Sequence, residues 1–151
     1  MSEIHHTIFY AAIMLVVGLG IPVFAALNGG LAIRLQNPMI ASVFALLAAI
    51  TVILVTLLVT EGVPRIRFDS SIPLWFYCGG VFVAIYILGM TFVAPRFGVG
   101  NAVAFVLLGQ LLSMAAIDQF ALFGAAQHSL TTQRLIGLAL MTVGVFLSVR
   151  R

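Results

Sequence analysis

Residues 98–120 read GVGNAVAFVLLGQLLSMAAIDQF, a run of membrane-spanning length in which Asp118 is the one charged side chain. About 20 apolar residues are enough to cross the hydrocarbon core of a bilayer. A carboxylate at that depth is costly, and it usually persists where it meets a partner, a cavity or a transported ion. Asp118 is therefore the first candidate functional residue. The structural alternative is that it caps a neighbouring helix or pairs with Arg134.

The whole chain has the composition of an integral membrane protein. Of its 151 residues, 63% are hydrophobic and 7% are charged, and the mean hydropathy is +1.24. A soluble domain carries about 25% charged residues. The stretch from Met1 to Thr7 contains neither Lys nor Arg, so we expect no cleavable signal peptide and expect the first apolar segment to remain in the mature chain.

Five apolar segments separated by short polar breaks predict an all-α protein with five transmembrane helices. Their approximate ranges are 8–35, 38–60, 73–94, 98–120 and 132–149. Pro22 lies inside the first segment and predicts a bend there, because proline removes a backbone donor. The loops leave little room for a soluble domain, so residues 1–151 are predicted to form a single membrane domain.

The arginines are almost evenly divided between the two faces of the membrane. Five crossings put the termini on opposite faces, with three arginines on the N-terminal side and four on the other. These are Arg65, Arg67 and Arg134 against Arg34, Arg96, Arg150 and Arg151. Orientation follows the Lys/Arg excess in short loops. Because the excess is so small, we expect the chain to insert both ways and to form an antiparallel homodimer; the alternative is one orientation, anchored by the terminal arginine pair.

Four further polar or aromatic residues are candidates for lining a substrate site. Trp75 and Tyr86 share one face by helical spacing, and an aromatic face with one polar tip suits an organic molecule or cation. Gln110 lies within about 80° of Asp118 around its helix, while Asn28 is late in the first segment. The alternatives are an ordinary core tyrosine, an interfacial tryptophan, and an amide that links helices.

Small residues on the fifth predicted helix mark one possible packing face. Gly137, Met141, Gly144 and Ser148 recur with a spacing of four, three and four. Small side chains let helix backbones approach closely in lipid. This face is either a dimer seam or, as the default, a packing face inside one subunit.

Several classes of function find little support in the sequence. The serines have no neighbouring histidine, His128 is in a predicted loop, and no His, Cys, Asp and Glu cluster has metal-ligand spacing. We therefore predict neither an enzyme nor a metal site nor a cofactor. No phosphate-binding loop is present to use ATP directly. The seven arginines are scattered at membrane edges, which indicates contact with the lipid bilayer and not with nucleic acid.

Three stretches together resemble the YdcZ-type family of five-helix drug/metabolite transporters, and the resemblance covers nearly the whole chain. They are PVFAALNGGLAIRLQNP at 22–38, GGVFVAIYILGMTFVAPRFGVGNAVAFVLLGQLLSMAAIDQF at 79–120, and TTQRLIGLALMTVGVFL at 131–147. Phe24 stands where this family usually has glutamine, and Gln119 and Ala121 also depart from its pattern. If those positions line the substrate site, this protein has a site that is more apolar than that of other family members, or one that is otherwise altered.

The resemblance implies a multi-pass protein of the bacterial inner membrane, related to one half of the ten-helix drug/metabolite transporters, whose halves are inverted repeats. We therefore predict a secondary transporter, an exporter of small metabolites or drugs that works by alternating access as a dual-topology homodimer. In this prediction Asp118 is the charge or proton site, Gln110 and Asn28 bind the small-molecule substrate, and Tyr86 with Trp75 form an aromatic wall. The alternative is a non-transporting scaffold or accessory subunit of a larger membrane complex.

Overall fold

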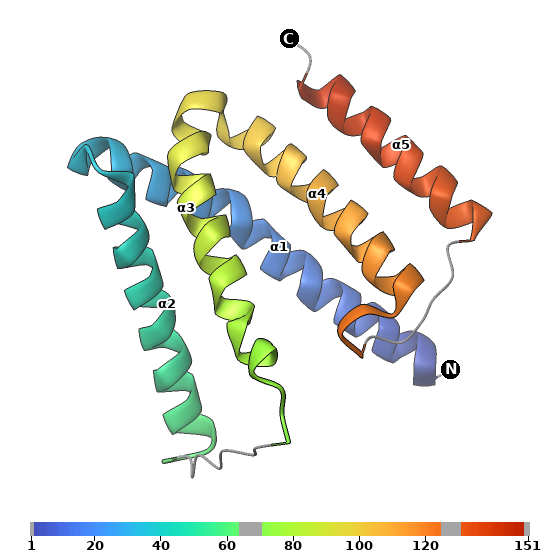
Figure 1. Ribbon diagram of the computed structural model, residues 1–151, viewed down its shortest axis with the longest axis horizontal. Helices are drawn as coiled ribbons and strands as arrows, with labels where there is room; N and C mark the ends of the chain where they lie inside the picture. Colours follow the sequence, from blue (N-terminus) through green and yellow to red (C-terminus); the bar gives the residue numbers. More distant parts are fainter. Residues whose placement is uncertain (1, 64–70, 125–130, 150–151) are drawn as a thin grey trace. The chain divides into compact units, whose positions relative to one another are not determined.

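The computed structural model describes residues 2–63, 71–124 and 131–149. These residues form five long helices, α1 to α5, with one short 3₁₀ helix before α3 and another after α4 (Figure 1). Each of the five is long and apolar enough to span a bilayer. The structure therefore confirms the predicted all-α, five-helix membrane fold.

The first helix, α1 (Ser2–Leu35), is longer than a bilayer core requires. At 1.5 Å per residue it extends about 50 Å, against a hydrocarbon thickness of about 30 Å. It begins six residues before the predicted start and continues through Pro22 without interruption. The missing proline donor removes one hydrogen bond, which a long transmembrane helix tolerates.

A tight turn joins α1 to α2 (Pro38–Thr60). Gln36 takes a left-handed conformation with φ of 53°, and the amide of Asn37 donates to the carbonyl of Ala32 at 3.2 Å. This is the geometry of a Schellman motif, which ends a helix by satisfying its last carbonyls. The Asn37 side chain then caps α2 by accepting hydrogen bonds from the amides of Met39 and Ile40, as asparagine commonly does before a helix.

The third span differs from the prediction of one helix over residues 73–94. A 3₁₀ helix, η1 (Leu74–Cys78), comes first, and α3 (Gly79–Phe97) begins at the glycine pair. At its other end α3 continues through Pro95, three residues beyond the predicted end. The helix ends before Gly98, whose φ of 93° favours glycine because a side chain would clash there.

The remaining spans are α4 (Val99–Phe120) and α5 (Thr132–Val149), with the short 3₁₀ helix η2 (Leu122–Gly124) after α4. Asn101 donates from its amide to the carbonyl of Phe97 at 2.9 Å. It therefore caps the end of the preceding helix.

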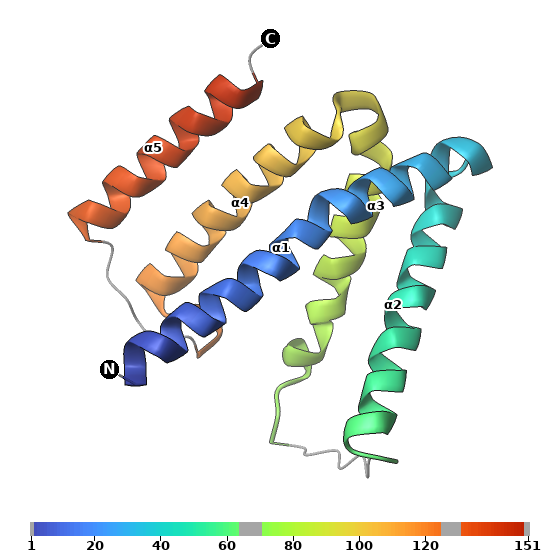
Figure 2. The ribbon, with the colours of Figure 1, turned by 180° about the vertical axis from the view of Figure 1, so that it is seen from behind.

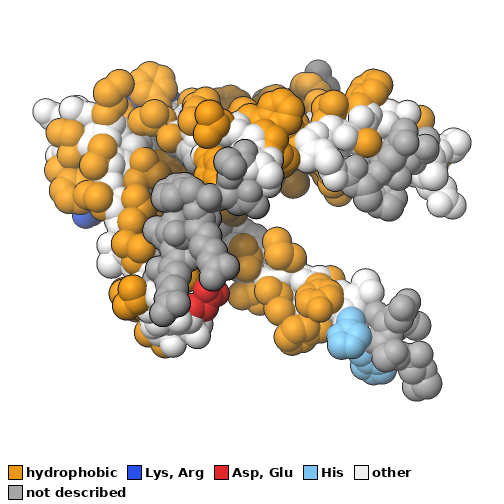
Figure 3. All heavy atoms as spheres, turned by 60° about the horizontal axis from the view of Figure 1, so that its bottom comes forward, with side chains coloured by type: hydrophobic (Ala, Val, Ile, Leu, Met, Phe, Trp, Pro, Cys, Tyr) orange, Lys and Arg blue, Asp and Glu red, His pale blue; other side chains and the backbone are white. Residues whose placement is uncertain are grey.

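The helices form two compact units, residues 1–96 and 97–151. In the first unit α1 packs against α2 and also contacts α3, and in the second α4 packs against α5 (Figures 1 and 2). On the face shown in Figure 3, hydrophobic side chains cover most of the described surface, and the described charged side chains are confined to small patches. Such a surface suits a lipid environment, because hydrocarbon covers apolar side chains at no cost.

Candidate functional site

A buried polar contact joins α1 to α3 in the first unit. The Asn28 side-chain amide donates to the Thr91 hydroxyl, and that hydroxyl donates to the carbonyl of Ile87 at 2.7 Å. Asn28 is 6% exposed and Thr91 is 1% exposed. The hydroxyl both accepts and donates, so this pair is a hydrogen-bonded polar group within an otherwise apolar interface.

One residue further along α1, the two helix backbones come very close. A Cβ atom built on Gly29 would lie 3.0 Å from Cγ of Pro95. Glycine allows this approach because it has no side chain. Gly29 therefore sets the spacing at which Asn28 and Thr91 can meet.

An aromatic pair lies next to the polar contact, about one turn towards the start of each helix. The rings of Phe24 and Tyr86 are stacked, with centroids 6.3 Å apart. Among the described residues, the Tyr86 hydroxyl is a buried side-chain oxygen with no hydrogen-bond partner. A buried hydroxyl without a partner costs free energy unless something satisfies it.

A pocket of about 290 Å³ opens where α1, α2 and α3 meet. Its polar lining residues are Gln36, Thr91 and Arg96, and its apolar lining residues are Ala32, Ile33, Pro38 and Pro95. Thr91 belongs both to this pocket and to the buried contact with Asn28. The pocket therefore leads towards the polar contact between α1 and α3.

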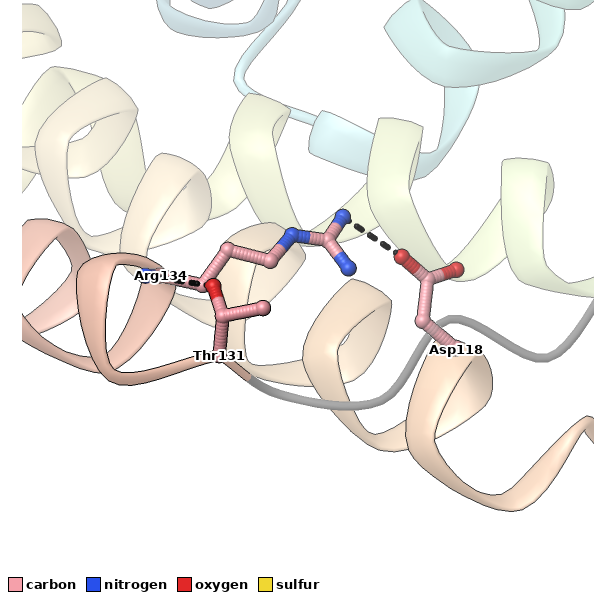
Figure 4. A network of polar contacts seen from close by, with 3 residues as sticks. All are labelled: Asp118, Thr131 and Arg134. Atoms are coloured by element: carbon pink, nitrogen blue, oxygen red, sulfur yellow. Dashed lines mark hydrogen bonds and ion pairs between the residues drawn. The ribbon is translucent and has the colours of Figure 1, made fainter.

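In the second unit, Asp118 near the end of α4 pairs with Arg134 in the first turn of α5. The Nη2 atom of Arg134 lies 2.7 Å from Oδ2 of Asp118, and the backbone amide of Arg134 donates to the Thr131 hydroxyl (Figure 4). The Arg134 side chain is 39% exposed and the Asp118 side chain is 19% exposed. Of the roles considered for Asp118, pairing with Arg134 is the one for which the structure supplies a contact.

The small-residue face of α5 is turned partly towards α4. Gly137 and Met141 line an apolar groove of about 260 Å³ together with Met114 and Ala115 of α4. A Cβ atom built on Gly137 or Gly144 would meet nothing within 4 Å, so these glycines mark no close helix contact here, and the role of this face stays a prediction.

Two other predicted site residues, Trp75 in the first unit and Gln110 in the second, have exposed side chains. Trp75 is in η1, is 66% exposed, and has its ring against that of Phe76. Gln110 is exposed on α4. Thus the structure brings Asn28 and Tyr86 to one interface, while Asp118 has a partner of its own on α5.

Some sequence-based expectations concern residues outside those that the structure describes. These are the loop and terminal charges Arg65, Arg67, Arg150 and Arg151, together with His128. Among the residues described, no group of three or more His, Cys, Asp or Glu side chains is arranged to hold a metal ion.

Sequence reasoning missed Thr91, Gln36 and Arg96 as parts of a site. A threonine in a transmembrane helix usually bonds to its own backbone and gives no distinctive signal. Gln36 and Arg96 read as ordinary loop residues. The available signal was Gly29 beside Asn28, since a small residue next to a polar one favours a close helix contact.

Five apolar spanning helices with a buried polar contact between two of them define a multi-pass integral membrane protein. Comparison with protein families then gives its family: residues 9–147 match the model described as "Putative inner membrane exporter, YdcZ". The chain belongs to this family. It is therefore a multi-pass inner-membrane protein of an exporter family, as predicted. The comparisons with curated proteins and with solved structures gave no significant match.

Proposed function

We propose that the protein is a secondary exporter of small organic molecules and that the α1–α3 contact binds the substrate. The observation that carries the proposal is the buried Asn28–Thr91 pair beside the unpartnered Tyr86 hydroxyl. Polar groups are expensive inside a membrane and commonly mark a transport pathway. A substrate that hydrogen-bonds to the Tyr86 hydroxyl would remove the cost of burying it.

The depth of these residues supports a transport role. Tyr86 lies ten residues before Arg96 on α3, which corresponds to about 15 Å along the helix axis. That is about half of the 30 Å hydrocarbon thickness. Transporters built from inverted repeats bind substrate near this midplane and expose it alternately to each side.

Two copies in opposite orientations would supply such inverted repeats. Five spans are an odd number, and the seven arginines divide three to four between the faces. With so little charge bias, both orientations are accessible to the chain. An antiparallel homodimer would then surround a central path with two copies of the α1–α3 site.

Asp118 remains the candidate for proton coupling in this proposal, with Gln110 about two turns earlier on α4. Its carboxylate pairs with Arg134, so a coupling role and a purely structural role must be separated by experiment. A coupling role requires that Asp118→Asn abolish export even when combined with Arg134→Gln. A purely structural ion pair predicts that the double variant, with both charges removed, exports normally.

Orientation is tested by thiol labelling in intact cells. Cys78 is first replaced, and a single cysteine is placed at either end of the chain before treatment with a membrane-impermeant reagent. Partial labelling of both ends supports the antiparallel dimer. Full labelling of one end and none of the other contradicts it and leaves a parallel or monomeric form.

Substrate binding is tested on the purified protein by screening small organic molecules for an increase in thermal stability. A molecule that binds the folded state stabilises it in proportion to the logarithm of its concentration. We expect Asn28→Ala to abolish the stabilisation and the matched control Asn101→Ala, which removes only a helix cap, to retain it. A protein that no molecule stabilises is better explained as a scaffold.

A further inference from the structure

The pocket at the junction of α1, α2 and α3 has a charged lining residue, whereas the buried contact between Asn28 and Thr91 is uncharged. Its lining contains one charged side chain, Arg96, and no acidic one. Arg34 is in the last turn of α1. From residue 4 to residue 60 the sequence contains no Asp or Glu, and from residue 71 to residue 117 it again contains none. The charges near the pocket are therefore positive.

The helix ends around the pocket do not cancel this charge. The C-terminal ends of α1 and α3 each carry a partial negative charge of about half an elementary unit, and the N-terminal end of α2 carries a similar positive one. The two arginines contribute full charges. The net field at the pocket favours an anion over a cation.

Arg96 is held in a position that leaves it able to bind. Its guanidinium lies over the ring of Phe92, 3.9 Å from the centroid, and its Nη1 atom donates to the Phe92 carbonyl. A guanidinium has five N–H donors in a planar fork that matches a carboxylate. The ring contact and the hydrogen bond to the Phe92 carbonyl hold the guanidinium in place, so less freedom is lost when a carboxylate binds.

Two uncharged groups complete the polar side of the pocket. Thr91 is almost fully buried and lies at the inner end, where it meets Asn28. Gln36 contributes from the turn between α1 and α2, although its left-handed backbone would suit glycine better. That conformation is the one that ends α1, and it places the Gln36 side chain in the pocket lining.

We infer that this pocket binds a small organic carboxylate, with the carboxylate on Arg96 and the body of the molecule against Ala32, Ile33 and Pro95. The inference rests on the proposed function and adds the substrate class: the pocket admits anions to the α1–α3 site and disfavours organic cations. The volume of about 290 Å³ suits a molecule of roughly the size of one substituted ring.

The test uses three probes of nearly the same shape and different charge: benzoate, benzamide and benzylamine. The full-length protein in lipid nanodiscs is titrated with each, and thermal stability is measured. We expect benzoate to bind at least tenfold more tightly than benzamide, as a charge-assisted hydrogen bond implies, and we expect benzylamine not to bind.

The matched variants are Arg96→Gln and Arg34→Gln, which remove the same charge from the last turn of α3 and of α1 respectively. Arg96→Gln should weaken benzoate binding about tenfold or more and leave benzamide binding unchanged, while Arg34→Gln should have a much smaller effect on both. Arg96→Lys keeps the charge without the planar fork and should give an intermediate affinity.

Three results would overturn the inference: no stabilisation by benzoate, equal stabilisation by benzoate and benzamide, or an equal effect of the two arginine variants. A different result tests the proposed function. If other molecules stabilise the protein and Asn28→Ala abolishes that stabilisation, the transport site stands and only its preference for anions is wrong.

Discussion

Gly29→Ala tests whether the close approach of α1 and α3 holds the candidate site together. The added methyl carbon would lie 3.0 Å from Cγ and 3.4 Å from Cδ of Pro95. Non-bonded carbons prefer separations of about 3.5–4.0 Å, so the shorter contact is about 0.5 Å too close. The Pro95 ring is closed on its own backbone and cannot rotate away. The two helices must therefore move apart.

The expected cost follows from what that movement disturbs. Overpacking a close interface typically costs about 1–3 kcal/mol. Separation of the helices also lengthens the neighbouring hydrogen bond between Asn28 and Thr91, and loss of a buried hydrogen bond costs a similar amount. The interface either stays overpacked or separates and loses the hydrogen bond, whichever costs less free energy. The two costs are therefore not added. We expect a loss of about 2 kcal/mol in the free energy of unfolding.

The assay is equilibrium unfolding of the purified protein in mixed micelles, followed by helical circular dichroism. Gly30→Ala is the matched control, because a Cβ atom there meets nothing within 4 Å. In that variant alanine should be neutral or should stabilise the helix by up to about 1 kcal/mol. The reasoning is refuted if the two variants unfold at the same denaturant concentration or if Gly29→Ala is the more stable.

Three further tests examine individual contacts by the same unfolding assay. Thr91→Val should cost about 1–3 kcal/mol, because it leaves a buried amide without its acceptor; Thr51→Val, which loses only a bond to its own helix, should cost much less, and equal losses would contradict the contact. Asn37→Ala should cost about 1 kcal/mol through loss of the α2 cap, and an unchanged midpoint would mean that water replaces the cap. A double-mutant cycle of Asp118→Asn and Arg134→Gln should give a coupling of about 1 kcal/mol, whereas additive losses would show that the pair contributes nothing.

Much of the fold follows from the sequence because the bilayer permits few alternatives. Within the hydrocarbon core every backbone group must bond internally, so an apolar segment of spanning length becomes a helix. The polar breaks at Asn37-Pro38 and Gly98 therefore mark real helix boundaries. The third span was harder to predict, since Pro95 ends many helices in water but only weakens one in lipid.

The candidate site was predicted only in part. Asn28 and Tyr86 stood out because polar atoms are rare in these segments, and the structure brings both to the α1–α3 interface. Trp75 was grouped with them by α-helical spacing, but residues 74–78 form a 3₁₀ helix to which that spacing does not apply. Asp118 was singled out for its charge, and the structure supplies its partner, Arg134.

The sequence by itself determined the class of protein, the number of spans, the near balance of arginines and the family, because all of these depend on composition and local order along the chain. Only the tertiary structure decided which polar groups meet. Asn28 and Thr91 are 63 positions apart in the sequence, and the residues around one of them do not indicate that it contacts the other. Their contact depends on how closely two helix backbones approach, which is set by the absence of a side chain at Gly29 and by the ring of Pro95 opposite it.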